Sequence, residues 1–114
     1  METVATDKPR ILVIDDDEQI RRVLLDIFRD IYSCCEASSG EEALTVLAQE
    51  SFNLVLSDIN MGGMSGLELV PQVLSLSPDS VVVMISGQSN IETAIEAMHA
   101  GAFDYIMKPF DIRH

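Results

Sequence analysis

Several residues that directly follow short apolar segments carry side chains suited to phosphoryl chemistry. They are an acidic run at positions 15–18, followed along the chain by Asp58, Ser86 and Lys108. Carboxylates bind hard divalent cations, and a carboxylate can also act as a nucleophile. A hydroxyl and an ammonium group can bind phosphoryl oxygens. Together these residues indicate metal-assisted phosphoryl transfer, provided that the fold brings them to one place.

Each of these residues also has an ordinary explanation when it is taken alone. Acidic residues at the start of a helix interact favourably with the helix dipole, which suits Asp17 and Glu18. Ser86 could be a turn serine, and Lys108, which precedes Pro109, could be a surface lysine in a turn. The occurrence of all of them after four separate apolar segments favours the chemical interpretation.

The segments that must position these side chains alternate between strand and helix patterns. Short apolar runs predict strands at 11–14, 54–56, 81–85 and 105–107, and a weaker one at 32–37. The segments between them predict helices at 18–31, 40–50, 66–76 and 90–100. This alternation predicts a doubly wound α/β fold, with a five-stranded parallel sheet and its functional site at the carboxyl ends of the strands.

Capping patterns predict where two of these helices begin. Ser38 with Glu41, and Ser65 with Glu68, have the spacing of a capping box. Pro71 lies inside the third predicted helix, where it lacks an N–H donor, and it predicts a kink or a late start.

Composition limits the class of protein. The 114 residues suffice for one domain, 47% are hydrophobic, and neither a signal peptide nor a membrane-spanning run is evident, so we expect a cytoplasmic globular domain. Seven Lys and Arg against 19 Asp and Glu give a formal charge of −12, which disfavours direct contact with nucleic acid. The adjacent Cys34 and Cys35 lack the spacing of a zinc site, and we expect both to be reduced packing residues.

Five stretches in order resemble the chemotaxis-type receiver domain of two-component response regulators: "ILVIDDDEQIRR", "ASSGEEAL", "NLVLSDINMGGMSGLEL", "VVVMISG" and "AGAFDYIMKPFD". The resemblance covers nearly the whole chain and implies a flavodoxin-like sheet of strand order 2-1-3-4-5. It makes residues 1–114 one receiver domain, expected to be the N-terminal part of a longer regulator. The chain ends where the fifth helix of the family would begin, so we expect that helix to be truncated or absent.

The resemblance also implies roles for the acidic residues. Asp58 would be the phosphoacceptor, whose carboxylate attacks the phosphohistidine of a sensor histidine kinase. Asp16, Asp58 and the main-chain carbonyl of Asn60 would ligate Mg²⁺ directly, and Asp15 would hold the ion through water. Because a carboxylate has no proton to lose, this chemistry needs charge neutralisation and no general base.

The remaining implied roles concern the phosphoryl group and the output. Lys108 would bind the phosphoryl oxygens, and Ser86 would bond one of them after transfer. Ser86 and Tyr105 would then move together as the switch that controls an output domain, plausibly a transcriptional one. Without a fifth helix an apolar stripe of the sheet would be bare, which suggests cover by another regulator chain or a homodimer.

Two other functions remain open at this point. A haloacid-dehalogenase-like phosphatase also uses an aspartate after a strand together with Mg²⁺, but it requires a second aspartate where this chain has Asn60. A degenerate receiver that only binds other proteins is disfavoured because every reactive position is filled. We therefore expect a signalling domain and not an enzyme that acts on free substrates.

Overall fold

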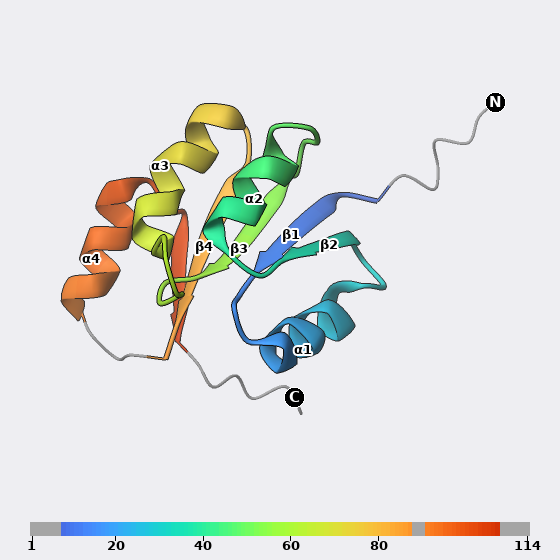
Figure 1. Cartoon of the computed structure of the whole chain (residues 1–114), viewed down its shortest axis with the longest axis horizontal. Coiled ribbons are helices and arrows are strands. Elements are labelled where there is room, and N and C mark those ends of the chain that lie inside the picture. The colour runs from blue at the N-terminus through green and yellow to red at the C-terminus, as the bar shows by residue number, and fades with distance from the viewer. Residues whose placement is uncertain (1–7, 88–90, 108–114) are drawn as a thin grey trace.

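Five parallel strands form the centre of the molecule, in the order β2-β1-β3-β4-β5 (Figure 1). The computed structural model describes residues 8–87 and 91–107. The strands are β1 (Arg10–Ile14), β2 (Ser33–Ala37), β3 (Leu54–Asp58), β4 (Val81–Ser86) and β5 (Asp104–Met107). All four neighbouring pairs are parallel, so the predicted doubly wound sheet is confirmed, including its weakest strand.

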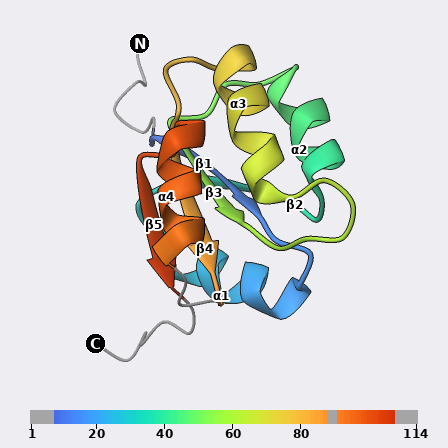
Figure 2. The ribbon, with the colours of Figure 1, turned by 90° about the vertical axis from the view of Figure 1, so that its left-hand side faces the viewer.

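Helices cover the two faces of the sheet unequally. The helices of the described residues are α1 (Glu18–Phe28), α2 (Gly40–Leu47), α3 (Gly66–Leu76) and α4 (Ile91–Ala100). Helices α2, α3 and α4 lie on one face, and α1 lies on the other (Figures 1 and 2). Alternate side chains of a strand point to opposite faces of the sheet. Leu12 and Ile14 therefore belong to the core under α2, α3 and α4, whereas Ile11 and Val13 belong to the core under α1.

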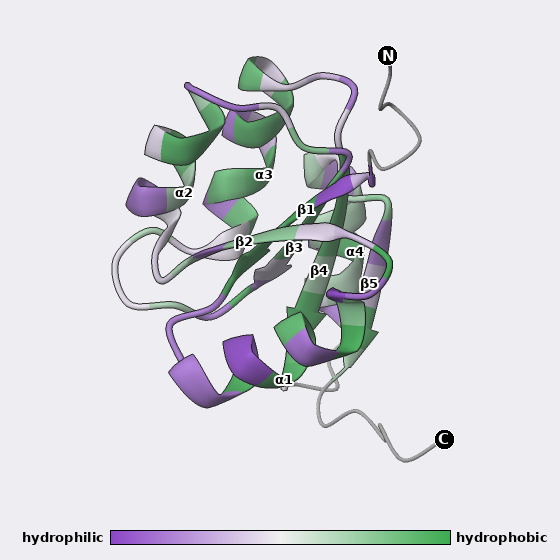
Figure 3. Cartoon of the chain, turned by 90° about the vertical axis from the view of Figure 1, so that its right-hand side faces the viewer, coloured by the Kyte–Doolittle hydropathy of each residue, from purple (hydrophilic) through white to green (hydrophobic). Residues whose placement is uncertain are grey.

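The sheet face under α1 is incompletely covered among the described residues. Val81 of β4 pairs in register with Leu54, and Ile106 of β5 pairs with Ile85, which places both on the α1 face. Val81 is 38% exposed and Ile106 is 42% exposed. Figure 3 views the sheet from the β2 side, with α2 and α3 above the hydrophobic strands and α1 below them. The bare apolar stripe expected from the sequence is therefore present near the β4–β5 side.

The capping box of α3 is confirmed. The Glu68 carboxylate accepts the N–H of Ser65 at 3.0 Å, and the Ser65 hydroxyl accepts the N–H of Glu68 at 3.2 Å. Helix α3 begins at Gly66, so the late start suggested by Pro71 is wrong, because these caps fix the first turn before the proline. The kink at Pro71 stays a prediction.

The predicted cap of α2 is wrong by one residue. Ser39, and not Ser38, is the N-cap, and its hydroxyl accepts the N–H of Glu42 at 3.0 Å. The Glu42 carboxylate in turn accepts hydrogen bonds from the N–H and hydroxyl of Ser38. Two overlapping serine–glutamate pairs, Ser38 with Glu41 and Ser39 with Glu42, have the same spacing in the sequence, so spacing alone could not distinguish them.

Three further features concern the two cysteines, the end of α4 and the character of the helices. Cys34 and Cys35 are half-buried free thiols, as predicted. Gly101 follows α4 with a φ of +116°, a conformation that favours glycine and ends the helix. Within residues 8–87 and 91–107, none of the helices has the length and apolar character that crossing a membrane requires.

Candidate metal and phosphoryl site

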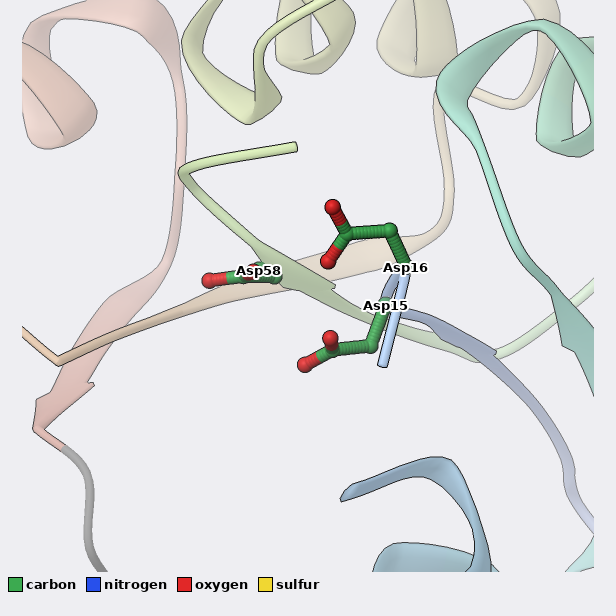
Figure 4. Close-up of side chains that lie close together, drawn as sticks. All are labelled: Asp15, Asp16 and Asp58. Carbon is green, nitrogen blue, oxygen red and sulfur yellow. The ribbon is translucent and has the colours of Figure 1, made fainter. Parts of the chain in front are cut away.

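Three carboxylates meet at the carboxyl ends of two neighbouring strands. Asp15 and Asp16 follow β1, and Asp58 is the last residue of β3. One oxygen from each carboxylate lies within 4.8 Å of the other two. Figure 4 shows the three side chains directed to the same side of the two strand ends. The structure thus brings together acids that are more than forty positions apart in the sequence.

This cluster has the character of a divalent cation site. Asp15 and Asp58 are buried, with exposures of 1% and 6%, whereas Asp16 is exposed. Two unit charges at this separation repel by about 3 kcal/mol at an effective dielectric constant of about 20. The Asp15 carboxylate accepts the N–H of Asp17 at 2.9 Å, and Asp16 accepts the N–H of Gly62 at 3.4 Å. An all-oxygen set of acids fits a hard dication such as Mg²⁺ or Ca²⁺.

The third aspartate of the run has a different function. Asp17 has extended backbone angles and is the N-cap of α1, with its carboxylate accepting the N–H of Gln19 at 2.9 Å. Glu18 is the acidic residue of the first helical turn. The helix-dipole explanation therefore applies to Asp17 and Glu18, as the sequence suggested, and it does not apply to Asp15 or Asp16.

The segment after Asp58 is held close to the start of α3. Ile59 is buried, and its carbonyl accepts the N–H of Gly66 at 2.8 Å. A Cβ atom on Gly66 would lie 2.3 Å from the main-chain oxygen of Asp58, so only glycine allows this approach. The sequence analysis did not identify Gly66, although a glycine directly after the cap residue Ser65 was a usable signal. Asn60 is exposed in this loop.

Ser86 lies at the same edge of the sheet, whereas Tyr105 is the second residue of β5. Ser86 is the last residue of β4 and is fully buried, one position beyond Ile85, the register partner of Asp58. Tyr105 of β5 is half-buried against the core under α2, α3 and α4. Lys108 lies outside the described residues, so its predicted contact with the phosphoryl group stays a prediction.

A hollow of about 940 Å³ lies at the opposite edge of the sheet. Its lining includes Lys8, Asn53 and Asp79, which come shortly before the starts of β1, β3 and β4. None of the three clustered aspartates lines this hollow. Chemistry that depends on these aspartates therefore belongs at the carboxyl edge.

Comparison with known proteins identifies the family and the fold. Residues 11–114 match the family described as the response regulator receiver domain. The chain belongs to this family. The receiver domain is 37% identical over 105 residues to the response regulator protein FleR of Pseudomonas aeruginosa, covering 91% of this chain and 22% of FleR. It is 39% identical over 103 residues to the DNA-binding transcriptional regulator NtrC of Salmonella typhimurium, covering 90% of this chain and 22% of NtrC.

Solved structures agree with the family assignment. A CheY-like receiver domain from Methanospirillum hungatei has a TM-score of 0.87 and 34% identity, over 94% of this chain and 86% of that one. A response regulator from Burkholderia pseudomallei, solved with a phosphorylated aspartic acid, a calcium ion and citrate, has a TM-score of 0.85 and 33% identity. That match covers 94% of this chain and 63% of the other. The receiver domain spans about a fifth of the length of the curated relatives named above.

Proposed function

We propose that this receiver domain accepts a phosphoryl group on Asp58 from a sensor histidine kinase in a Mg²⁺-dependent reaction. The observation that carries the proposal is the convergence of Asp15, Asp16 and Asp58 within 4.8 Å at the ends of β1 and β3. A buried nucleophile at a strand end has a fixed direction of attack, which lowers the entropic cost of reaching the transition state.

In this reaction a carboxylate oxygen of Asp58 attacks the phosphorus of a phosphohistidine. The new O–P bond forms an acyl phosphate, and the breaking N–P bond leaves its electron pair on the imidazole of the kinase. Asp58 is modified once per transfer, so the domain is a signalling component and not an enzyme acting on free substrates. The lack of an ionisable proton on the attacking carboxylate removes the need for a general base.

The proposed metal-binding residues are those that the resemblance to receiver domains implies. We assign Asp16, Asp58 and the main-chain carbonyl of Asn60 as direct ligands, and Asp15 as a ligand through water. Bound Mg²⁺ supplies positive charge that lets an anionic carboxylate approach an anionic phosphoryl group. The similar Burkholderia pseudomallei protein was solved with a calcium ion and a phosphorylated aspartic acid, which supports binding of a dication and phosphorylation of an aspartate in this domain.

The response to phosphorylation involves the neighbouring strand ends. We assign the buried Ser86 hydroxyl and the Lys108 ammonium as groups that bind the phosphoryl oxygens. Tyr105, half-buried in β5, then changes position with Ser86 and alters the surface around α4 and β5. A new double negative charge in a tightly packed region biases such a two-state element.

The partners follow from the relatives. Several are transcriptional regulators much longer than this chain, so we propose that residues 1–114 form the N-terminal receiver domain of a cytoplasmic regulator with a transcriptional output domain. The exposed apolar side chains near β4 and β5 then contact another regulator chain, such as a second copy. Direct contact of this domain with nucleic acid is disfavoured by its charge of −12.

Acetyl phosphate provides the decisive experiment. Incubation of the 114-residue protein with Mg²⁺ and acetyl phosphate should add one phosphoryl group, stable in acid and labile in base, detected by intact mass and peptide mapping. Asp58→Ala should remove the adduct, and Asp79→Ala, which changes an exposed acid far from the cluster, should keep it. Labelling that persists in Asp58→Ala would contradict the assignment. Turnover of phosphomonoesters by the wild type would instead favour the hydrolase.

A further inference from the structure

Arg21 joins three parts of the chain beside the acidic cluster. Its Nη1 donates to the main-chain oxygen of Asp15 at 2.7 Å, and its Nε donates to Oε1 of Glu36 in β2 at 2.7 Å. The Arg21 side chain is only 14% exposed, compared with 50% for Glu36. Both bonds lie in the range of strong charge-assisted hydrogen bonds. Helix α1, the β1–α1 connection and β2 are thus linked through one side chain.

The bond to Asp15 fixes the peptide that carries Asp16. On the N-terminal side of this peptide, the N–H of Asp15 donates to the main-chain oxygen of Ala37 in β2 at 3.2 Å. Asp16 is exposed, lies in a bend, and bonds Gly62 over a long 3.4 Å. The orientation of the Asp15–Asp16 peptide therefore depends on the guanidinium that holds its oxygen.

We propose that Arg21 is a positioning residue of the metal site, which holds the Asp15–Asp16 peptide so that both carboxylates face Asp58. This inference rests on the proposed metal-dependent function. Groups that orient metal ligands without touching the metal typically change metal affinity by about 10–100-fold when removed. Arg21 acts here through a main-chain oxygen and not through a ligand atom.

Electrostatics and positioning predict opposite effects for Arg21. A cation close to the site repels Mg²⁺, so loss of its charge alone would strengthen Mg²⁺ binding. Loss of the hydrogen bond to Asp15 would instead release the ligands and weaken binding. Arg21→Lys keeps the positive charge but lacks the planar guanidinium that reaches two acceptors. This variant therefore separates the effect of the charge from the effect of the hydrogen bond to Asp15.

Isothermal titration calorimetry with Mg²⁺ tests the proposal on the 114-residue protein. We expect Arg21→Met and Arg21→Lys each to raise the Kd by about tenfold or more. The matched control is Arg22→Met, since the Arg22 side chain is 73% exposed and, among the described residues, pairs only with Glu18 on the same helix. Its Kd should stay close to the wild-type value. In the metal-free protein, the amide NMR signals of Asp16 and Asp17 should shift in both Arg21 variants and not in Arg22→Met.

Either of two results would overturn the proposal: unchanged or tighter Mg²⁺ binding by Arg21→Met, or wild-type affinity in Arg21→Lys. If thermal unfolding in chelator shows that the Arg21 variants are not folded, Glu36→Gln replaces them. Its control is Glu42→Gln, which removes an equal charge that interacts with Arg21 electrostatically but forms no hydrogen bond with it. Glu36→Gln should weaken Mg²⁺ binding more than Glu42→Gln, and equal effects would overturn the proposal.

The same titrations separate this inference from the proposed function. A wild-type protein that neither binds Mg²⁺ nor forms the Asp58 adduct would refute the proposed function. A wild-type protein that does both, with an Arg21→Met variant of equal affinity, would refute the positioning role alone.

Discussion

Adjacent identical residues in this receiver domain have different environments. Asp15 and Asp16 join Asp58 in the acidic cluster, whereas Asp17 caps α1 through the N–H of Gln19. The difference arises because the backbone leaves the strand at this point, and successive side chains no longer alternate between two sheet faces. Three neighbouring aspartates therefore differ in role: two belong to the acidic cluster, and the third stabilises the start of a helix.

The first prediction compares two of these aspartates. Asp16→Asn should raise the Kd for Mg²⁺ by at least about tenfold, which is about 1.4 kcal/mol, because it removes a charged ligand. Asp17→Asn removes the same charge but keeps a good cap, so its Kd should change far less. Calorimetric titration measures both. Equal losses in the two variants would show that the overall charge, and not the cluster, determines affinity.

A second prediction concerns Glu42 at the start of α2. The hydrogen bonds from the N–H and hydroxyl of Ser38 lower the pKa of this carboxyl below its ordinary value of 4.5. A folded-state pKa below the unfolded one gives stability that is present above the unfolded pKa and is lost as the pH falls through the folded pKa. Glu42→Gln should therefore flatten the acid side of the stability curve.

Urea unfolding at a series of pH values below 5 measures this effect. Glu41→Gln is the control, because the Glu41 side chain forms no hydrogen bond with another described residue. The effect should be small, since Glu42 is exposed and its interactions are screened by water. Parallel curves for wild type and Glu42→Gln would contradict the prediction.

At the level of elements, the contact between β3 and α3 determines where Asp58 lies. The first residue of α3, Gly66, packs against the backbone of Asp58 and Ile59, and a Cβ atom there would also come within 2.6 Å of Met84. Backbone atoms cannot move aside as the end of a side chain can. Any larger residue must therefore displace either the helix or the end of the strand.

The third prediction follows from this contact. Gly66→Ala should destabilise the fold by about 1–3 kcal/mol, the usual cost of overpacking, and should slow phosphorylation by acetyl phosphate. Gly62→Ala is the matched control, because nothing lies within 4 Å of the added atom and its φ is not positive. Its stability should remain within about 0.5 kcal/mol of wild type. Chemical denaturation of the two variants measures the difference, and equal stabilities would contradict the close approach.

At the scale of the whole molecule, the proposed metal binding would be coupled to folding. The acids of the cluster come from residues far apart in the sequence, so the site exists only in the folded chain. A ligand that binds only the folded state stabilises it by RT ln(1 + [L]/Kd), which is about 2.7 kcal/mol at 100 times the Kd.

The fourth prediction is that Mg²⁺ raises the Tm of this domain. Calorimetric scans in chelator and in Mg²⁺ at about 100 times the Kd should differ by several degrees. NaCl at matched ionic strength serves as the control, since general screening of a charge of −12 also stabilises the fold. Asp16→Asn should lose most of the Mg²⁺-specific shift. An equal rise in NaCl would contradict specific binding.

The sequence by itself determined the order of elements, the parallel sheet and the edge at which Asp58 and Ser86 lie. Hydrophobic periodicity and capping residues act over a few positions, and parallel strands must place their carboxyl ends together. The resemblance carried by five stretches then supplied the roles that we propose for the site residues. None of this required knowledge of distances between remote segments.

Only the tertiary structure decided which neighbouring residues take which contacts. The choice of Ser39 over Ser38 as a cap, the approach of Gly66 to Asp58 and the bond from Arg21 to Asp15 all depend on how separate elements pack. Residues with the same local sequence pattern, even neighbouring ones, can therefore make different contacts. Local sequence patterns carry no such distances, because packing across the sheet sets them.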